Sequence, residues 1–267
     1  MEIFYKYFLN IDIDLQKEIA NCGLNIELGL KSLIISHNDE RFQRIYNLMS
    51  DMGEVEQIST EFTKSEIGNA EYLQLNPSWH CGYPMPDNDN GYYEMTFDLS
   101  VYCPKCGVGL KQKAPFRMKK EPNWGKKHIT QLYWVYDEYF VKPEIWENIF
   151  KPLGIGKIPV LHYKTEKELE TVVQLKVDKI ASSELLINSD QKRNTCESCG
   201  RLKYYPYVRG FYPKFGEDVD PSIHMIKTKE YWGSGASADR SIIVSHELYH
   251  LINENKIKGV SFTPMEN

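Results

Sequence analysis

The sequence predicts an α+β fold, with mixed and antiparallel sheets, a few packed helices and a split, zinc-ribbon-like double knuckle. Apolar residues alternate along residues 1–9 and 92–102, which is typical of strands that bury one face. Along residues 42–49 and 145–153 they recur every three or four positions, as on the buried face of a helix. The knuckle is indicated by a Cys-x-x-Cys-Gly motif that occurs twice.

Residues 1–75 are predicted to form an N-terminal α/β region. Asp12 or Asp14 can begin its first helix, because a carboxylate accepts hydrogen bonds from the free N–H groups of a first turn. The expected elements, in order, are a strand at 1–9, a helix ending near Gly23, a strand at 33–35, a helix from Asn38 to Gly53 and a strand at 70–75.

Residues 76–267 are predicted to form a second domain that contains both cysteine motifs, although one continuous globular unit is also compatible with the sequence. Pro143 suits the first turn of a helix, and Gly154 suits its end. The expected elements are a loop at 76–91, strands at 92–102, 129–135, 158–163, 171–177, 241–244 and 260–262, and helices at 143–153 and 245–256.

Composition restricts the classes of function. The chain has 267 residues, of which 42% are hydrophobic, so it can bury a sizeable core. Its 32 Lys and Arg against 37 Asp and Glu give a net charge of −5, which provides no general attraction to nucleic acid or to an anionic membrane. No signal peptide and no membrane span are predicted, and six cysteines do not form a disulfide scaffold. These features predict a cytoplasmic protein that does not bind membranes.

Four cysteines are the candidate metal ligands, namely Cys103, Cys106, Cys196 and Cys199. A Cys-x-x-Cys turn directs two thiolates at one point, and the glycine after it suits the positive φ that such a turn tends to need. Two turns supply the four soft ligands of a closed tetrahedral site, so we expect a structural Zn²⁺. Residues 107–195 separate the halves, against roughly 15–20 residues in a compact ribbon, so a shared ion requires the chain to return.

Other roles for these thiols stay open at this level. Each pair can be a redox dithiol or a disulfide, the four thiols can be unbound, or two separate sites can exist. A thioredoxin-like motif needs a strand before it and a helix after it. Pro104 and the glycine after each motif do not favour such a helix, so one shared site is the preferred interpretation.

Basic and aromatic residues are interleaved in two segments, 111–127 and 201–214. The first is rich in lysine and contains Phe116 and Trp124. This composition matches single-stranded nucleic-acid binding, in which cations contact phosphates and aromatic rings stack on bases. A solvated loop is the simpler interpretation of such a charge run.

Residues 246–250 read His-Glu-Leu-Tyr-His and match the His-Glu-x-x-His signature of zinc peptidases. On a helix, His246 and His250 lie on the face opposite Leu248 and Ile252. A catalytic zinc also needs a third ligand and a cleft. We therefore expect an amphipathic helix with both histidines toward water, and assign no catalytic residue.

The order of these parts resembles a bacterial family named for its double CXXCG motif. The resemblance covers about residues 90–265, and it rests on the following features. They are Cys-x-x-Cys-Gly at 103–107, a helix ending in Leu-Gly at 144–154, Pro159-Val160, Gln174-Leu175, Cys-x-x-Cys-Gly-Arg at 196–201, Val244-Ser245, Lys258-Gly259-Val260 and Phe262-Thr263-Pro264. Some members are described as immunity proteins, so the resemblance implies a non-enzymatic, zinc-stabilised partner of a protein toxin.

Three functions are therefore expected, in decreasing order. The first is an immunity protein that neutralises a toxin, with the loop 79–93 and the tyrosine-rich segment 204–212 as candidate contact surfaces. The second is a zinc-ribbon protein that binds nucleic acid, and the third is a metallopeptidase. Neither a phosphate-binding loop nor a serine-hydrolase elbow occurs in the sequence.

Overall fold

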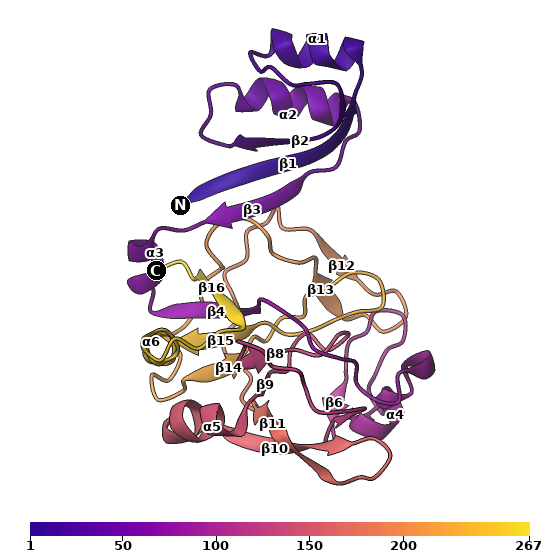
Figure 1. The fold of residues 1–267 in the computed structure, drawn as a ribbon, viewed down its shortest axis with the longest axis vertical. Helices are drawn as coiled ribbons and strands as arrows, with labels where there is room; N and C mark the ends of the chain where they lie inside the picture. Colours follow the sequence, from indigo (N-terminus) through magenta and orange to yellow (C-terminus); the bar gives the residue numbers. More distant parts are fainter. The chain divides into compact units, whose positions relative to one another are not determined.

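The computed structural model describes residues 1–267 and divides into two compact units. Unit 1 consists of Met1–Glu66 and Val208–Phe211, and unit 2 of Ile67–Tyr207 and Tyr212–Asn267 (Figure 1). The division at Glu66 lies before the expected boundary at residue 75, because the strand at 72–77 pairs within a sheet of unit 2. The sheets are mostly antiparallel and six α-helices accompany them, which confirms the α+β class.

Unit 1 is a three-stranded antiparallel sheet with two helices. Its elements are β1 (Glu2–Ile11), α1 (Ile13–Asn21), β2 (Gly29–Ser36), α2 (Phe42–Asp51) and β3 (Gln57–Glu61), with sheet order β2-β1-β3. Every second residue of β1 is buried, as the alternation predicts. Asp12 caps α1 by accepting hydrogen bonds from Asp14 N–H and Leu15 N–H. The core of the unit joins β1 to Ile19 of α1 and to Ile45 of α2.

Unit 2 is built on two larger sheets. The four-stranded sheet has the order β14-β15-β4-β16, with β14 (Met225–Lys227), β15 (Ile242–Ser245), β4 (Tyr72–Pro77) and β16 (Val260–Pro264). The five-stranded sheet has the order β7-β10-β11-β9-β8, with β7 (Arg117–Met118), β8 (Ile129–Thr130), β9 (Phe140–Val141), β10 (Gly156–His162) and β11 (Glu168–Lys176). All their pairings are antiparallel except that of β7 with β10.

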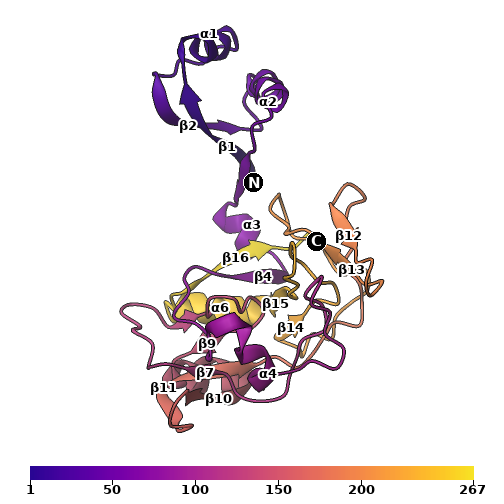
Figure 2. The same cartoon turned by 90° about the vertical axis from the view of Figure 1, so that its right-hand side faces the viewer.

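Helices complete unit 2. They are α3 (Lys64–Gly68), which spans the division between the units, the short turn η1 (Asn88–Asn90), α4 (Tyr92–Thr96), α5 (Pro143–Ile145) with its continuations η2 (Trp146–Phe150) and η3 (Lys151–Leu153), and α6 (His246–Glu254). Ile149 and Phe150 of η2, and Leu248 and Ile252 of α6, belong to one core that also contains residues of both sheets. Figure 2 shows α6 beside β15, the strand that leads directly into it. No helix has the length and apolar character needed to cross a membrane.

Two hairpins carry the cysteine motifs. The first consists of β5 (Phe97–Asp98) and β6 (Lys111–Gln112), and the second of β12 (Arg193–Thr195) and β13 (Leu202–Tyr204). Each Cys-x-x-Cys-Gly motif lies in the loop of its hairpin. Antiparallel pairing therefore fixes both ends of each motif, so the thiols project from anchored turns.

Two expected strands are wrong in part. Residues 92–102 were expected to be extended, but they begin with α4, because the side chains of Tyr92 and Thr96 are both buried one helical turn apart. The strand expected at 129–135 ends at Thr130, and the chain turns at Trp134, whose φ of 69° lies in the left-handed region. Both changes occur beside a cavity described below.

Candidate metal centre

The two cysteine turns have the same backbone hydrogen bonds. Gly107 N–H donates to the carbonyl of Cys103 at 2.8 Å, and Gly200 N–H donates to that of Cys196 at 2.8 Å. Cys103 N–H donates to the carbonyl of Val108 at 2.9 Å, and Cys196 N–H donates to the backbone carbonyl of Arg201 at 2.9 Å. The equivalence indicates that the two motifs are two copies of one kind of turn.

The structure brings all four predicted cysteines together. Their sulfur atoms lie within 4.8 Å of one another, with Cys103 Sγ 3.9 Å from Cys196 Sγ and Cys106 Sγ 3.7 Å from Cys199 Sγ. Four thiolates bound to Zn²⁺ at about 2.3 Å in a tetrahedron have sulfur–sulfur distances of about 3.8 Å. The cluster therefore has the dimensions of a metal site, and the chain between the motifs does return.

Most of the site is buried, and backbone N–H groups favour the ionised form of two of its thiols. Cys103, Cys106 and Cys196 are buried, and Val108 and Tyr231 pack around the cluster. Hydrogen bonds from Cys106 N–H and Lys105 N–H lower the pKa of Cys103 to about 6, and bonds from Cys199 N–H and Ser198 N–H lower the pKa of Cys196. Burial raises the pKa of Cys106 to about 12, so a cation in the cluster would be needed to keep all four sulfurs ionised.

Two cationic side chains fasten the turns to each other and to a nearby loop. Arg201 Nη1 donates to the carbonyl of Val108 at 2.9 Å, which joins the second turn to the first. Lys203 is 3% exposed, and its ammonium donates to the carbonyls of Cys106 at 2.9 Å, Gly235 at 2.6 Å and Ser237 at 2.8 Å. A buried ammonium with three acceptors is satisfied, so Lys203 holds residues 233–238 against the first turn.

The other sequence motif does not assemble a comparable site. His246 and His250 stack on each other with ring centroids 4.3 Å apart, and His250 is exposed. Glu247 is exposed and lies 3.7 Å from His224 Nδ1. Among all 267 described residues, the four cysteines are the only group of three or more Cys, His, Asp or Glu whose ligand atoms converge as a metal site needs.

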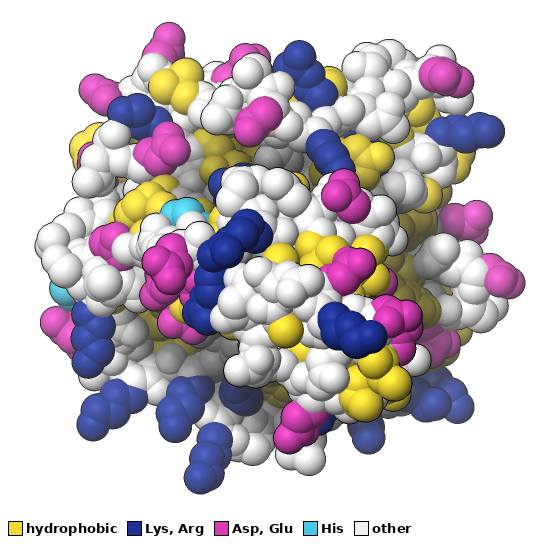
Figure 3. All heavy atoms as spheres, turned by 90° about the horizontal axis from the view of Figure 1, so that it is seen from above, with side chains coloured by type: hydrophobic (Ala, Val, Ile, Leu, Met, Phe, Trp, Pro, Cys, Tyr) yellow, Lys and Arg dark blue, Asp and Glu magenta, His cyan; other side chains and the backbone are white.

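The aromatic residues of the basic segment lie in the core. Phe116 is 0% exposed and Trp124 is 8% exposed, with Trp124 Nε1 donating to the carbonyl of Thr171 at 2.9 Å. These two rings are therefore not free to stack on bases. Figure 3 shows both acidic and basic side chains on the surface that it draws, so the visible surface is not uniformly basic.

Sequence reasoning missed a second group of polar residues, which lies in unit 2. Lys227 of β14 is 9% exposed and contacts Glu138 Oε1 at 2.5 Å and Asp137 Oδ2 at 3.3 Å. Asp239 lies in the same cavity lining. The available signals were a charged pair between two tyrosines at 136–139 and a lysine that follows two apolar residues in a strand.

The chain was compared with protein-family models, curated proteins and solved structures, and none of them matches it.

Proposed function

We propose that Cys103, Cys106, Cys196 and Cys199 hold one structural Zn²⁺, as in a zinc ribbon whose two halves are far apart in sequence. The convergence of four sulfurs within 4.8 Å supports this proposal. Four soft ligands suit Zn²⁺ and leave no open position for a substrate, which favours a structural ion over a catalytic one.

The ion can be tested by elemental analysis of protein purified without added metal. We expect about one zinc per chain, and chelation should destabilise the protein because metal binding contributes to folding. Near-zero metal with six free thiols would contradict the proposal. Two zinc ions per chain would instead support a second site at His246 and His250.

For the whole chain we propose a non-enzymatic cytoplasmic binding protein, namely an immunity protein that neutralises a bacterial toxin. The family resemblance suggests this role, and several exposed aromatic side chains support it. Tyr83, Tyr133, Trp134 and Tyr136 are between 41% and 48% exposed, and Tyr205 is 42% exposed. Tyrosine and tryptophan are enriched among the residues that dominate protein–protein affinity.

The immunity function can be tested by competition between strains. A strain lacking this gene should lose to its parent when the two grow in contact, because the parent would deliver a toxin that the deletion strain cannot neutralise. Expressing the protein should restore survival, and the Glu247→Gln variant should restore it equally if no peptidase chemistry is involved. Equal fitness of parent and deletion strain would contradict the proposal.

Nucleic-acid binding is the second candidate. Lys111, Lys113, Lys119, Lys120 and Lys126 are exposed along the basic segment, which favours it. The burial of Phe116 and Trp124 and the net charge of −5 weigh against it. A steep loss of RNA or DNA affinity with added salt would support this candidate instead.

A further inference from the structure

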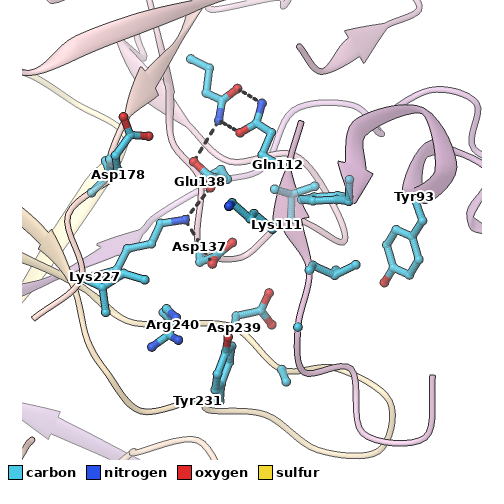
Figure 4. Close-up of a pocket in the computed structure, with 18 of the residues that line it drawn as sticks. Tyr93, Lys111, Gln112, Asp137, Glu138, Asp178, Lys227, Tyr231, Asp239 and Arg240 are labelled. Atoms are coloured by element: carbon cyan, nitrogen blue, oxygen red, sulfur yellow. Dashed lines mark hydrogen bonds and ion pairs between the residues drawn. The ribbon is translucent and has the colours of Figure 1, made fainter. Parts of the chain in front are cut away.

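A cavity of about 500 Å³ lies in unit 2, between α4, the turn at 134–138, β14 and the segment 231–240. None of the four cysteines lines it, although Tyr231 packs against both the cavity and the cysteine cluster, and of the five exposed aromatic residues named above only Trp134 lines it. Figure 4 shows the side chains of Asp137, Glu138, Lys227 and Asp239 gathered on one side of this cavity.

A fixed hydrogen-bond network forms that side. Glu138 Oε1 accepts from Lys227, and Glu138 Oε2 accepts from Gln174 Nε2 at 2.9 Å. Gln174 is 1% exposed and exchanges two hydrogen bonds with Gln112, at 2.7 and 2.9 Å. Because Glu138, in the turn before β9, is held by Lys227 of β14 and Gln174 of β11, the charges of this wall are fixed before any ligand enters.

Asp239 is the least compensated charge of the cavity. Ser237 Oγ donates to its Oδ2 at 2.9 Å, and no cation forms an ion pair with it. Burial, and next the charge of Asp137, raise the pKa of Asp239 to about 7, although Lys227 and Lys203 oppose this shift. Figure 4 shows the carboxylates of Asp137 and Asp239 directed toward the same space.

Aromatic and aliphatic side chains form the other walls, with Tyr92, Tyr93, Phe97, Trp134 and Tyr231 as the aromatic ones. Trp134 has the left-handed φ of 69°, and its ring lies 4.6 Å from that of Tyr83 and 6.3 Å, stacked, from that of Tyr92. A bulky residue in this conformation is strained, and such strain concentrates at ligand and active sites. Arg240 also lines the cavity, but its guanidinium lies 4.0 Å over the ring of Tyr231 and donates to two backbone carbonyls.

When ionised, the charged groups of the lining that are not exposed leave a surplus of one negative charge. They are the carboxylates of Asp137, Glu138 and Asp239 and the cations Lys227 and Arg240, whereas Asp178 and Lys111 are exposed. The carboxylates do not converge as ligands of a metal ion. One organic cation would remove the surplus, and the aromatic walls would attract it further through their ring faces.

We propose that this cavity binds an organic cation through a single guanidinium or primary ammonium group, seated between Asp239 and Asp137 and covered by Trp134. The site goes beyond the proposed immunity function, which assigns no ligand to this cavity. The cation can come from a free small molecule or from an arginine or lysine side chain of a polypeptide.

Calorimetric titration with N-butylguanidinium, and with N-butylurea as its neutral isostere, tests the proposal on the intact, metal-loaded chain. We expect the cation to bind at least about tenfold more tightly than the urea. Asp239→Asn should remove most of this preference. Asp178→Asn is the matched control, because Asp178 lies on the exposed rim and pairs with Lys176, so its loss should change the affinity by less than about threefold.

The pH provides an independent readout. Between pH 6 and 8 Asp239 loses its proton, so affinity for the cation should rise by up to about tenfold, and Asp239→Asn should flatten this rise. Circular dichroism of each variant verifies its fold. Equal binding of cation and urea, or equal losses in the two variants, would overturn the proposal.

A blocked Ala-Arg-Ala peptide distinguishes the two sources. Binding at least about tenfold tighter than butylguanidinium, and lost when citrulline replaces arginine, identifies a polypeptide side chain as the occupant. Equal or weaker binding identifies a free small cation. Both results presuppose that butylguanidinium binds more tightly than butylurea, so neither supports the proposal if the two bind equally.

Discussion

Gly107 and Gly200 occupy equivalent positions in the two cysteine turns, yet their surroundings differ. Both have a positive φ, of 84° and 70°. A Cβ atom on Gly107 would lie 2.3 Å from the carbonyl oxygen of Ala236, whereas one on Gly200 would meet nothing within 4 Å. The two positions therefore separate the cost of the backbone conformation from the cost of contact with residues 233–238.

We expect Gly200→Ala to lower the free energy of unfolding by about 1–2 kcal/mol, the cost of a left-handed L-residue. Gly107→Ala should lower it by about 2–5 kcal/mol, because the backbone of the loop must also move. Denaturant unfolding of both variants measures the difference. Equal losses would show that the loop yields to the methyl group without cost.

At the scale of elements, Lys227 ties β14 of one sheet to the turn before β9 of the other. Lys227→Met should destabilise unit 2 by about 3–5 kcal/mol, because Glu138 is then left buried without its cation. Lys229→Met is the control. Its ion pair with Glu184 is exposed, so the loss should be within about 1 kcal/mol.

Chemical denaturation of the two lysine variants, under identical metal loading, gives this comparison directly. A small effect of Lys227→Met would mean that Glu138 takes up a proton at little cost. In that event the double variant Lys227→Met, Glu138→Gln would be no more stable than the single one.

Element types were predictable where a local pattern had one interpretation. The alternation of β1, the cap at Asp12, and the helix between Pro143 and Gly154 are such cases. Prediction failed at residues 92–96, where alternating aromatic residues also suit a short buried helix. The cysteine site was predictable because its ligands form a local motif. The cavity was not, since Glu138, Lys227 and Asp239 meet only through sheet packing.

At the scale of the molecule, one ion would close a loop of the chain. Cys103 and Cys199 contribute to opposite halves of the cluster, so either serine variant should release the metal and lower the melting temperature by a similar amount. The double variant should be little worse than either single one, because the shared site is already lost. Cys22→Ser, a cysteine outside the cluster, should retain the metal.

Melting curves together with metal analysis of the four variants provide the measurement. Additive losses in the double variant would indicate two independent sites. The prediction would have no basis if the wild-type protein contained no metal and its melting temperature did not change when a chelator was added.

The separation of the two hairpins also sets an order of events during synthesis. Cys103 and Cys196 are 93 positions apart, an interval that takes roughly 5–20 s to translate at about 5–20 residues per second. Throughout that interval Cys103 and Cys106 have been synthesised but Cys196 and Cys199 have not. Strand β4 likewise has been synthesised before its neighbours β15 and β16. Unit 2 can therefore form its last contacts only late in synthesis, and Cys103 and Cys106 have no partner cysteines until then. By contrast, β1, β2 and β3 are available to pair once the first 61 residues have been made.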